Sequence, residues 1–99
     1  MSLQYTEWLS ALDFETQARI DNRMLRVKQG NLGDCENLKE GVFELRFLGA
    51  GPGYRIYFGK DELNIVLLLI GGIKRTQTKD IKKSKELWNE YKRSKNKNE

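Results

Sequence analysis

The sequence contains no histidine and a single cysteine, Cys35. A zinc site built from cysteine and histidine ligands is therefore excluded, as is an internal disulfide bond. Serine–histidine and cysteine–histidine catalysis is excluded too, because each needs an imidazole as its base. The chain also lacks the Gly-rich loop, ending in lysine and serine or threonine, that binds nucleotide phosphates. We expect neither a metal ion nor a cofactor.

Long hydrophobic runs are also missing. The longest runs from Ile65 to Ile70, which is the length of a buried strand rather than of the roughly 18 residues that span a membrane. The N-terminus has no apolar stretch of the kind found in secretory signals. With 99 residues and a hydrophobic content of 38%, the chain has enough apolar residues for one modest core. We expect a single cytoplasmic domain with no membrane partner.

The net charge of +4 says less than it first suggests. Residues 81–99 hold seven Lys and Arg against three Asp and Glu, whereas the basic and acidic residues of 1–80 are equal in number. The excess charge therefore belongs to the C-terminal end. What bears on a binding site within the domain is the position of each arginine and lysine, not the total.

The N-terminal part predicts two helices in a hairpin. Thr6 can cap a short first helix, and Asp13 can cap a longer second helix that ends near Gln29. Gly30 then supplies the left-handed residue that stops it. The apolar residues of the first helix are Trp8, Leu9 and Leu12, and those of the second are Phe14, Ala18, Ile20, Met24, Leu25 and Val27.

Three arginines of the second helix share one stripe, because Arg19, Arg23 and Arg26 stand at i, i+4 and i+7. One interpretation is a solvated face on which Glu15 pairs with Arg19. The other is a contact with a polyanion or an acidic partner, since the stripe has no matching acidic stripe to balance it. The sequence alone leaves both open.

The stretch from Gly41 to Thr78 predicts three consecutive strands. Apolar and polar residues alternate in the first two, which is typical of strands with one buried face. The apolar set is Phe43, Leu45, Phe47, Tyr54, Ile56 and Phe58, and the polar set is Glu44, Arg46, Arg55 and Tyr57. Pairing them as a hairpin through the turn at 49–53 places Arg46, Arg55 and Tyr57 on one face. A third strand over Ile65–Ile70 ends at Gly71–Gly72.

After this strand comes the polar segment 73–78, and Thr78 or Asp80 can cap a last helix. We predict a single domain over residues 1–91. Residues 92–99 are basic and carry no apolar anchor, so we expect a disordered tail there.

Arginine, lysine and tyrosine are thus the residues left for chemistry, and they suit a phosphodiester. They can stabilise charge that develops on phosphate oxygens, while the 2′-hydroxyl of RNA supplies an internal nucleophile. Arg55 would clamp the scissile phosphate, and Arg46 or Lys74 would neutralise the transition state. Lys74, beside arginines, could also exchange a proton, and Tyr57 could donate one or stack on a base. Further RNA contacts are assigned to Arg19, Arg23, Arg26, Arg75 and Gln77. Glu44 is expected to form ion pairs, and Asp80 to cap a helix.

The same stretches resemble a known family. The matching segments are Trp8-Leu9 with Leu12, Ala18-Arg19-Ile20 with Arg23 and Arg26, Gly30-Asn31, Gly33-Asp34, Gly41-Val42, Glu44-Leu45-Arg46, GPGYRIYF at 51–58, and Gly72 with Lys74, Thr76-Gln77 and Asp80-Ile81. In this order and spacing the sequence resembles the RelE/ParE superfamily of type II toxins, in particular the HigB-like branch of phage-derived addiction-module killer proteins.

The resemblance implies an α+β fold, in which an N-terminal helical hairpin packs on a small antiparallel sheet of three or four strands, with a C-terminal helix. It also implies an endoribonuclease that cuts mRNA in the ribosome without a metal ion, and a helix-turn-helix antitoxin as partner. Arg46, Arg55 and Lys74 occupy positions where such toxins carry functional basic residues. No counterpart of the tyrosine or histidine that some relatives use occurs among residues 78–81. A gyrase inhibitor of the ParE kind, or an inactive module that binds antitoxin or nucleic acid, is the alternative.

Overall fold

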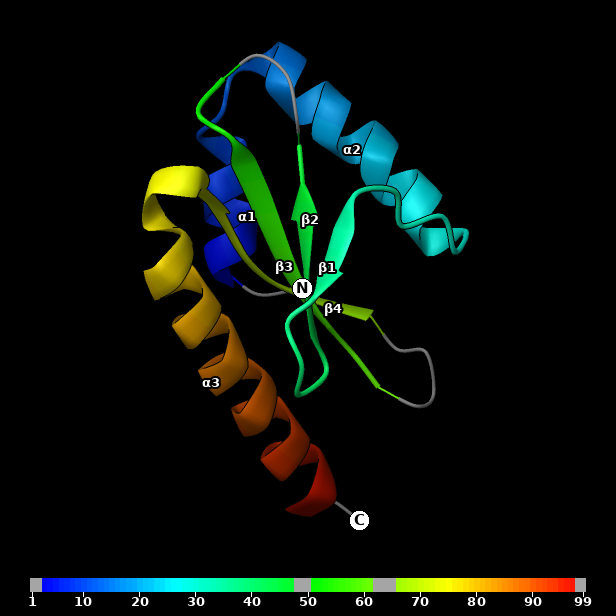
Figure 1. Cartoon of the computed structure of the whole chain (residues 1–99), viewed down its shortest axis with the longest axis vertical. Helices are drawn as coiled ribbons and strands as arrows, with labels where there is room; N and C mark the ends of the chain where they lie inside the picture. Colours follow the sequence, from blue (N-terminus) through cyan, green and yellow to red (C-terminus); the bar gives the residue numbers. More distant parts are fainter. Residues whose placement is uncertain (1–2, 48–50, 62–65, 98–99) are drawn as a thin grey trace.

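The computed structural model describes residues 3–47, 51–61 and 66–97. Along these ranges the elements are α1 (Leu3–Ser10), α2 (Phe14–Lys28), β1 (Cys35–Asn37), β2 (Val42–Arg46), β3 (Tyr54–Lys60), β4 (Val66–Ile73), the 3₁₀ turn η1 (Lys74–Thr76) and α3 (Gln77–Lys97) (Figure 1). None of the helices in these ranges combines the length and the apolar composition needed to cross a membrane.

The four strands form an antiparallel sheet in the order β1-β2-β3-β4. In the register of β2 with β3, Leu45 lies opposite Ile56 and Arg46 lies opposite Arg55. Directly opposed residues share a face, so the register confirms that the apolar and the polar sets segregate to different faces. The predicted α+β fold, with its N-terminal helices and C-terminal helix, is confirmed.

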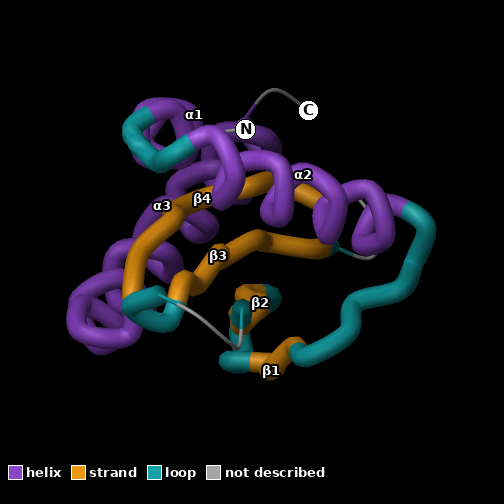
Figure 2. Tube along the Cα trace, turned by 90° about the horizontal axis from the view of Figure 1, so that it is seen from above, coloured by secondary structure: helices purple, strands orange, loops and turns teal. Residues whose placement is uncertain are grey.

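One face of the sheet is covered by α1 and α2 (Figure 2). Its buried residues come from both helices and from the apolar sets of β2 and β3: Tyr5, Ile20, Met24, Val27, Leu45, Phe47, Ile56 and Phe58. On α2 the three buried positions recur at i, i+4 and i+7, the spacing of one helical face. Phe14 and Leu25, which the sequence also placed in the apolar set, are 87% and 56% exposed.

The other face packs on α3, chiefly over β3 and β4. Trp88 is the largest side chain buried there, among Val42, Leu69 and Ile70. A Cβ on Gly59 would lie 2.1 Å from the Trp88 ring, so the strand is bare where the indole rests on it. α3 runs past the sheet toward the C-terminus, as Figure 1 shows. It also reaches β2, at Val42 beside Trp88 and at Glu44, whose carboxylate accepts a hydrogen bond from Gln77.

The ends of α2 follow the sequence prediction. The Asp13 carboxylate accepts a hydrogen bond from the Thr16 backbone N–H at 3.1 Å, and its pKa is lowered mainly by the Thr16 hydroxyl and backbone bonds. Past the C-terminus, Gly30 has φ of +90°, the left-handed conformation that glycine adopts without strain.

The glycine pair 71–72 does not end the third predicted strand, because β4 continues through it to Ile73. Glycine is needed there for close approach: a Cβ on Gly71 would lie 1.9 Å from the Trp8 ring, and one on Gly72 would lie 2.1 Å from Asp80 Oδ2. The Gln4 side chain also donates to the Gly71 carbonyl at 3.2 Å and accepts from its N–H at 3.0 Å. A strand prediction based on backbone propensity misses these tertiary contacts. Ile65, its expected start, lies outside the described residues.

Three helix boundaries also differ from the prediction. α1 begins at Leu3, so Thr6 lies inside it rather than at its cap. α3 begins at Gln77, and both Thr78 and Asp80 lie within its first turn. At its other end α3 continues to Lys97, whereas we expected no regular structure from Lys92 onward. Lysine and arginine favour helix, and Lys95 Nζ bonds Asp61 at 3.2 Å. The domain boundary at residue 91 stays a prediction.

Candidate functional site

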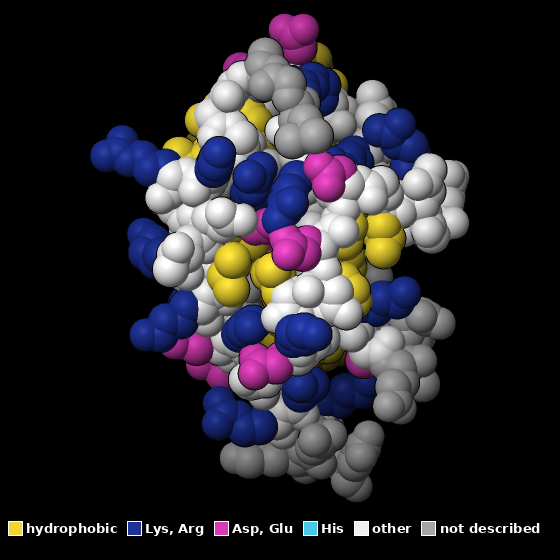
Figure 3. Space-filling view, in the orientation of Figure 1, with side chains coloured by type: hydrophobic (Ala, Val, Ile, Leu, Met, Phe, Trp, Pro, Cys, Tyr) yellow, Lys and Arg dark blue, Asp and Glu magenta, His cyan; other side chains and the backbone are white. Residues whose placement is uncertain are grey.

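The candidate site lies on the α3-facing side of the sheet, at the part of β2 and β3 next to the start of α3. Glu44 is opposite Tyr57 and Arg46 is opposite Arg55, so these four side chains leave the same face. β1 extends this surface with Glu36, which is opposite Glu44. In the space-filling view, Lys and Arg side chains gather near the middle of this face, with Asp and Glu side chains among them (Figure 3).

Arg46 is held by two carboxylates. Its Nε donates to Glu44 Oε1 at 2.8 Å, and its Nη2 forms an ion pair with Glu36 Oε2. These contacts offset the repulsion expected between two arginines placed directly opposite on neighbouring strands. Most of the Arg46 charge is therefore balanced within the protein.

Glu44 is fully buried, at 0% exposure, and connects two elements of the site. One carboxylate oxygen accepts from Arg46, and the other accepts from Gln77 Nε2 at 2.8 Å. Gln77 is the first residue of α3, so this carboxylate links β2 to the start of the helix. Because both oxygens are bonded and water is excluded, Glu44 positions its neighbours and is not accessible to an RNA hydroxyl.

Arg55, unlike Arg46, has no carboxylate partner in the described part of the chain. It is only 7% exposed, and its Nε has no hydrogen-bond partner among the described residues. Within the same residues, no carboxylate forms an ion pair with it. A buried cation without a partner is costly, since its desolvation is not compensated. The described residues therefore leave the Nε donor of this guanidinium unpaired.

Tyr57 lies on the same face as Arg46 and Arg55, but its ring is not accessible enough to stack on a base. Its ring is 0% exposed and lies in the α3-side core with Val42 and Trp88, so the predicted stacking of Tyr57 on a base does not fit the structure. The hydroxyl is buried beside the Glu44 carboxylate, but no well-formed hydrogen bond joins it to a partner in the described part of the chain. Burial, followed by the nearby Glu44 carboxylate, raises the pKa of Tyr57, so the hydroxyl stays protonated.

Lys74 and Arg75 follow β4 at its end and are both exposed. Lys74 reaches the site at Gly53, where a built Cβ would lie 3.0 Å from Lys74 Cβ and 3.7 Å from Arg55 Nη1. The Lys74 N–H donates to the Pro52 carbonyl at 3.4 Å, which ties this turn to the loop before β3. Lys74 is thus an exposed residue whose Cβ lies near the Arg55 guanidinium, across Gly53.

The arginine stripe of α2 lies beside the end of β2, and its middle member, Arg23, already bonds the protein backbone. The Arg23 guanidinium donates to the carbonyls of Arg46, Leu32 and Asp34, and it lies 4.7 Å from the centroid of the Phe47 ring. Burial lowers its pKa. Arg23 therefore connects α2 to the end of β2. Arg19 and Arg26 are exposed on either side of it, and with Asn22 and Phe47 they line a hollow of about 290 Å³.

Of the residues predicted for the site, the structure brings together Arg46, Arg55, Tyr57, Lys74 and Gln77, with Arg75 beside them. Arg26 lines a hollow of about 360 Å³ with Arg46 and so reaches the edge of the cluster, whereas Arg19 does not. Sequence reasoning missed the bridging role of Glu44 and the presence of Glu36. The signal for Glu44 was its alternation with buried residues on β2, which placed it under α3. The bond from Gln77 required the fold.

The acidic residues near the site have structural partners. Asp80 is 8% exposed and accepts from the Thr76 hydroxyl at 2.5 Å, which stabilises the junction of η1 and α3. In the described ranges, no three His, Cys, Asp or Glu side chains gather where they could hold a metal ion. Burial raises the pKa of the Cys35 thiol, which favours its unreactive form.

Two comparisons place the chain among known proteins. Residues 7–92 match the family described as phage derived protein Gp49-like (DUF891). A protein of Haemophilus influenzae, described only as an uncharacterized protein, is 42% identical over 87 residues, which are 87% of each chain. No solved structure matches the chain. Because the family match covers nearly the whole domain, the chain belongs to the Gp49-like family of phage-derived proteins, which is a family of RelE/HigB-type toxins.

Proposed function

We propose that the protein is the toxin of a type II toxin–antitoxin pair and acts as a ribosome-dependent endoribonuclease that cleaves mRNA. The observation that carries the proposal is Arg55, a nearly buried guanidinium whose Nε lacks a partner among the described residues. The family of RelE/HigB-type toxins supports the same activity.

The chemistry fits a phosphodiester. A phosphate oxygen bound by Arg55 would compensate its desolvation with a charge-assisted hydrogen bond, and the planar guanidinium can bind two oxygens at once. A phosphate therefore gains more here than at an exposed arginine, because the protein has already desolvated the donor.

The reaction needs no nucleophile from the protein. The 2′-oxygen attacks the adjacent phosphorus, a P–O2′ bond forms and the P–O5′ bond breaks. The products are a 2′,3′-cyclic phosphate and a 5′-hydroxyl, and the proton lost by the 2′-hydroxyl is balanced by one gained at O5′. Arg55 stabilises the charge on the phosphate oxygens and fixes the attack geometry.

Among the remaining basic groups, Lys74 is better placed than Arg46 to act on the substrate. Arg46 is neutralised by Glu36 and Glu44, whereas Lys74 is exposed beside Arg55 and forms no ion pair within the described residues. In the proposal, Lys74 neutralises the charge of the transition state and exchanges the proton. The Arg46–Glu44 ion pair has a positioning role next to Arg55.

The partners follow from the proposal. The toxin requires a cognate antitoxin, which we expect to be a helix-turn-helix protein encoded beside it, and it meets mRNA on the ribosome. Induced expression should arrest growth, and co-expression of the neighbouring gene should restore it. If growth is unaffected, an inactive binding module is the better reading.

The direct test is cleavage of ribosome-bound mRNA by the purified protein, mapped by primer extension. We expect discrete cuts from the unmodified protein, a loss of at least about 100-fold for Arg55→Ala, as for one oxyanion-stabilising donor, and full activity for the exposed Arg93→Ala. A parallel gyrase supercoiling assay separates the ParE-like alternative. Gyrase inhibition without RNA cleavage would refute the nuclease.

A further inference from the structure

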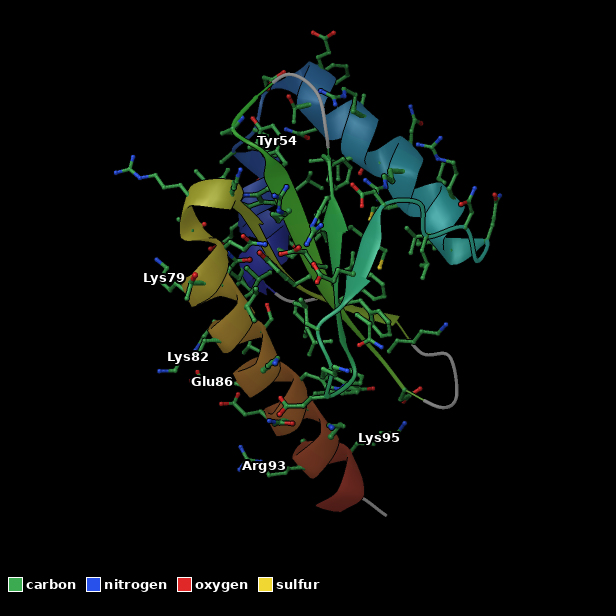
Figure 4. All side chains as sticks on the ribbon, in the orientation of Figure 1. Tyr54, Lys79, Lys82, Glu86, Arg93 and Lys95 are labelled. Carbon is green, nitrogen blue, oxygen red and sulfur yellow. The ribbon has the colours of Figure 1, made fainter. Side chains whose placement is uncertain are left out.

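A basic surface extends from the candidate site along α3. It consists of Lys74, Arg75, Lys79, Lys82 and Lys83, and all five side chains are exposed. Lys79 lies three positions before Lys82 and four before Lys83, which places them on one side of the helix. Figure 4 shows Lys79 and Lys82 pointing away from the sheet, and Figure 3 shows Lys and Arg side chains along this flank of the molecule.

No acidic side chain balances this basic surface within residues 73–85 of the described chain. Asp80 is the one carboxylate in that range, and it is buried and bonded to Thr76. The next acidic residue along α3 is Glu86. The positive end of the helix dipole, at Gln77, lies within the same surface and adds to its potential. Glu86 lies four positions after Lys82 and three after Lys83, so the run of positive charge extends from Lys74 to Lys83 and ends at this carboxylate.

The composition of the surface favours nucleic acid over protein. A stable protein interface has an apolar centre surrounded by polar residues. The exposed residues of 74–83 are instead lysine, arginine and threonine throughout. The exposed apolar residues Leu3, Phe14 and Leu25 lie on the α1 and α2 side of the molecule. Charges without an apolar centre match a phosphate backbone, which is bound largely by electrostatic contacts.

We propose that this basic surface is an RNA-docking track that continues from the phosphate site at Arg55, an inference that rests on the proposed function. From Gln77 to Lys83, α3 rises by roughly 9 Å, the length of about three phosphates along one duplex strand. Lys74 joins the two parts, since it lies beside Arg55 at Gly53. The track binds the part of the RNA away from the scissile phosphate. Of its residues, only Lys74 takes part in the cleavage reaction.

The test is binding of a fluorescent 2′-O-methyl RNA oligonucleotide, measured by anisotropy at several salt concentrations. This RNA lacks the attacking hydroxyl, so binding is measured without cleavage. The variant K79A/K82A should reduce the slope of log affinity against log salt by about 1.4, because each phosphate contact on a single strand contributes about 0.7. The control K28A/K39A removes two exposed cations outside α3 and should leave the slope unchanged.

The outcomes separate this inference from the nuclease assignment. An unchanged slope in a K79A/K82A protein that still cleaves mRNA overturns the track alone. A reduced slope in a protein that never cleaves mRNA supports the track and refutes the nuclease. If the slope is unchanged but K79A/K82A weakens binding of the antitoxin, the surface belongs to an acidic protein segment and the inference is wrong. Urea unfolding of both variants checks that each is folded.

Discussion

The two faces of the sheet are built on different principles. Under α1 and α2 the buried side chains are apolar apart from the hydroxyl of Tyr5, and they form the larger core cluster. Under α3 the buried set also includes Glu44, Arg55, Tyr57, Asp80 and Ser84. Burial of the first face stabilises the fold. On the second face, part of this stabilisation is offset by the cost of desolvating charged groups.

This difference supports the proposal that the polar face serves binding. Glu44, Asp80 and Ser84 have protein partners, so their burial is compensated within the fold. Arg55 Nε and the Tyr57 hydroxyl have none among the described residues. Unpaired buried groups are retained where a ligand uses them, as is common at functional sites. The polar face is therefore the one that selection for stability alone does not explain.

The largest effect on stability is expected on the apolar face. Phe58→Ala should lower the free energy of unfolding by about 3–5 kcal/mol, because it opens a cavity in a core where the ring is fully buried. Urea denaturation measures the loss. Leu25→Ala is the matched control, since that side chain is 56% exposed and should cost well under half as much. Equal losses from the two variants would contradict the placement of the core.

The next effect tests the bridge on the polar face. Glu44→Gln should cost about 2 kcal/mol, because the amide cannot accept charge-assisted bonds from both Arg46 and Gln77. It should also lower the cleavage activity, since the Arg46–Glu44 ion pair next to Arg55 is weakened. Glu36→Gln serves as the control: its carboxylate is 51% exposed, and its loss should change stability little. If the two variants unfold alike, Glu44 does not act as a bridge.

The smallest effect is expected for Tyr57→Phe. The hydroxyl has no partner in the described chain, so its removal should change the unfolding free energy by less than about 1 kcal/mol at neutral pH. A loss of several kcal/mol would mean that the hydroxyl is hydrogen-bonded in solution.

The same variant makes a prediction about pH. The pKa of Tyr57 is raised in the folded state, so the folded protein keeps a proton that the unfolded chain loses above about pH 10. Stability should be unchanged below that pH and should fall above it, less steeply in Tyr57→Phe. Burial raises the pKa of Tyr5 to about 12, so a smaller decline remains in the variant. Identical profiles of stability against pH for the unmodified protein and Tyr57→Phe would show that Tyr57 does not have a raised pKa.

Much of the fold could be read from local patterns. The alternation around Leu45 and Ile56 predicted the β2–β3 hairpin, its register and the face of Arg46 and Arg55, because strand periodicity ties burial to position. Asp13 and Gly30 predicted the ends of α2, since capping depends on a few neighbouring residues.

What the sequence could not supply depends on contacts between distant segments. Gly71 belongs to β4 because Trp8 packs on it. The Arg23 guanidinium donates hydrogen bonds to the carbonyls of Asp34, in the loop before β1, and of Arg46, in β2. The same holds for the site: the alternation of β3 predicted the face of Arg55, but its burial and its unpaired Nε depend on the folded neighbours of that face. Whether an arginine has a partner within the protein depends on the tertiary structure, and it is the basis on which we propose Arg55 rather than Arg46 as the phosphate-binding residue.

The central claim is that Arg55 serves RNA cleavage at the expense of stability, and one paired measurement on Arg55→Ala tests it. The account predicts that cleavage of ribosome-bound mRNA falls by at least about 100-fold while the free energy of unfolding stays the same or rises, because an uncompensated buried cation has been removed. Retained cleavage, or a loss of cleavage that merely follows a large loss of stability, would contradict it.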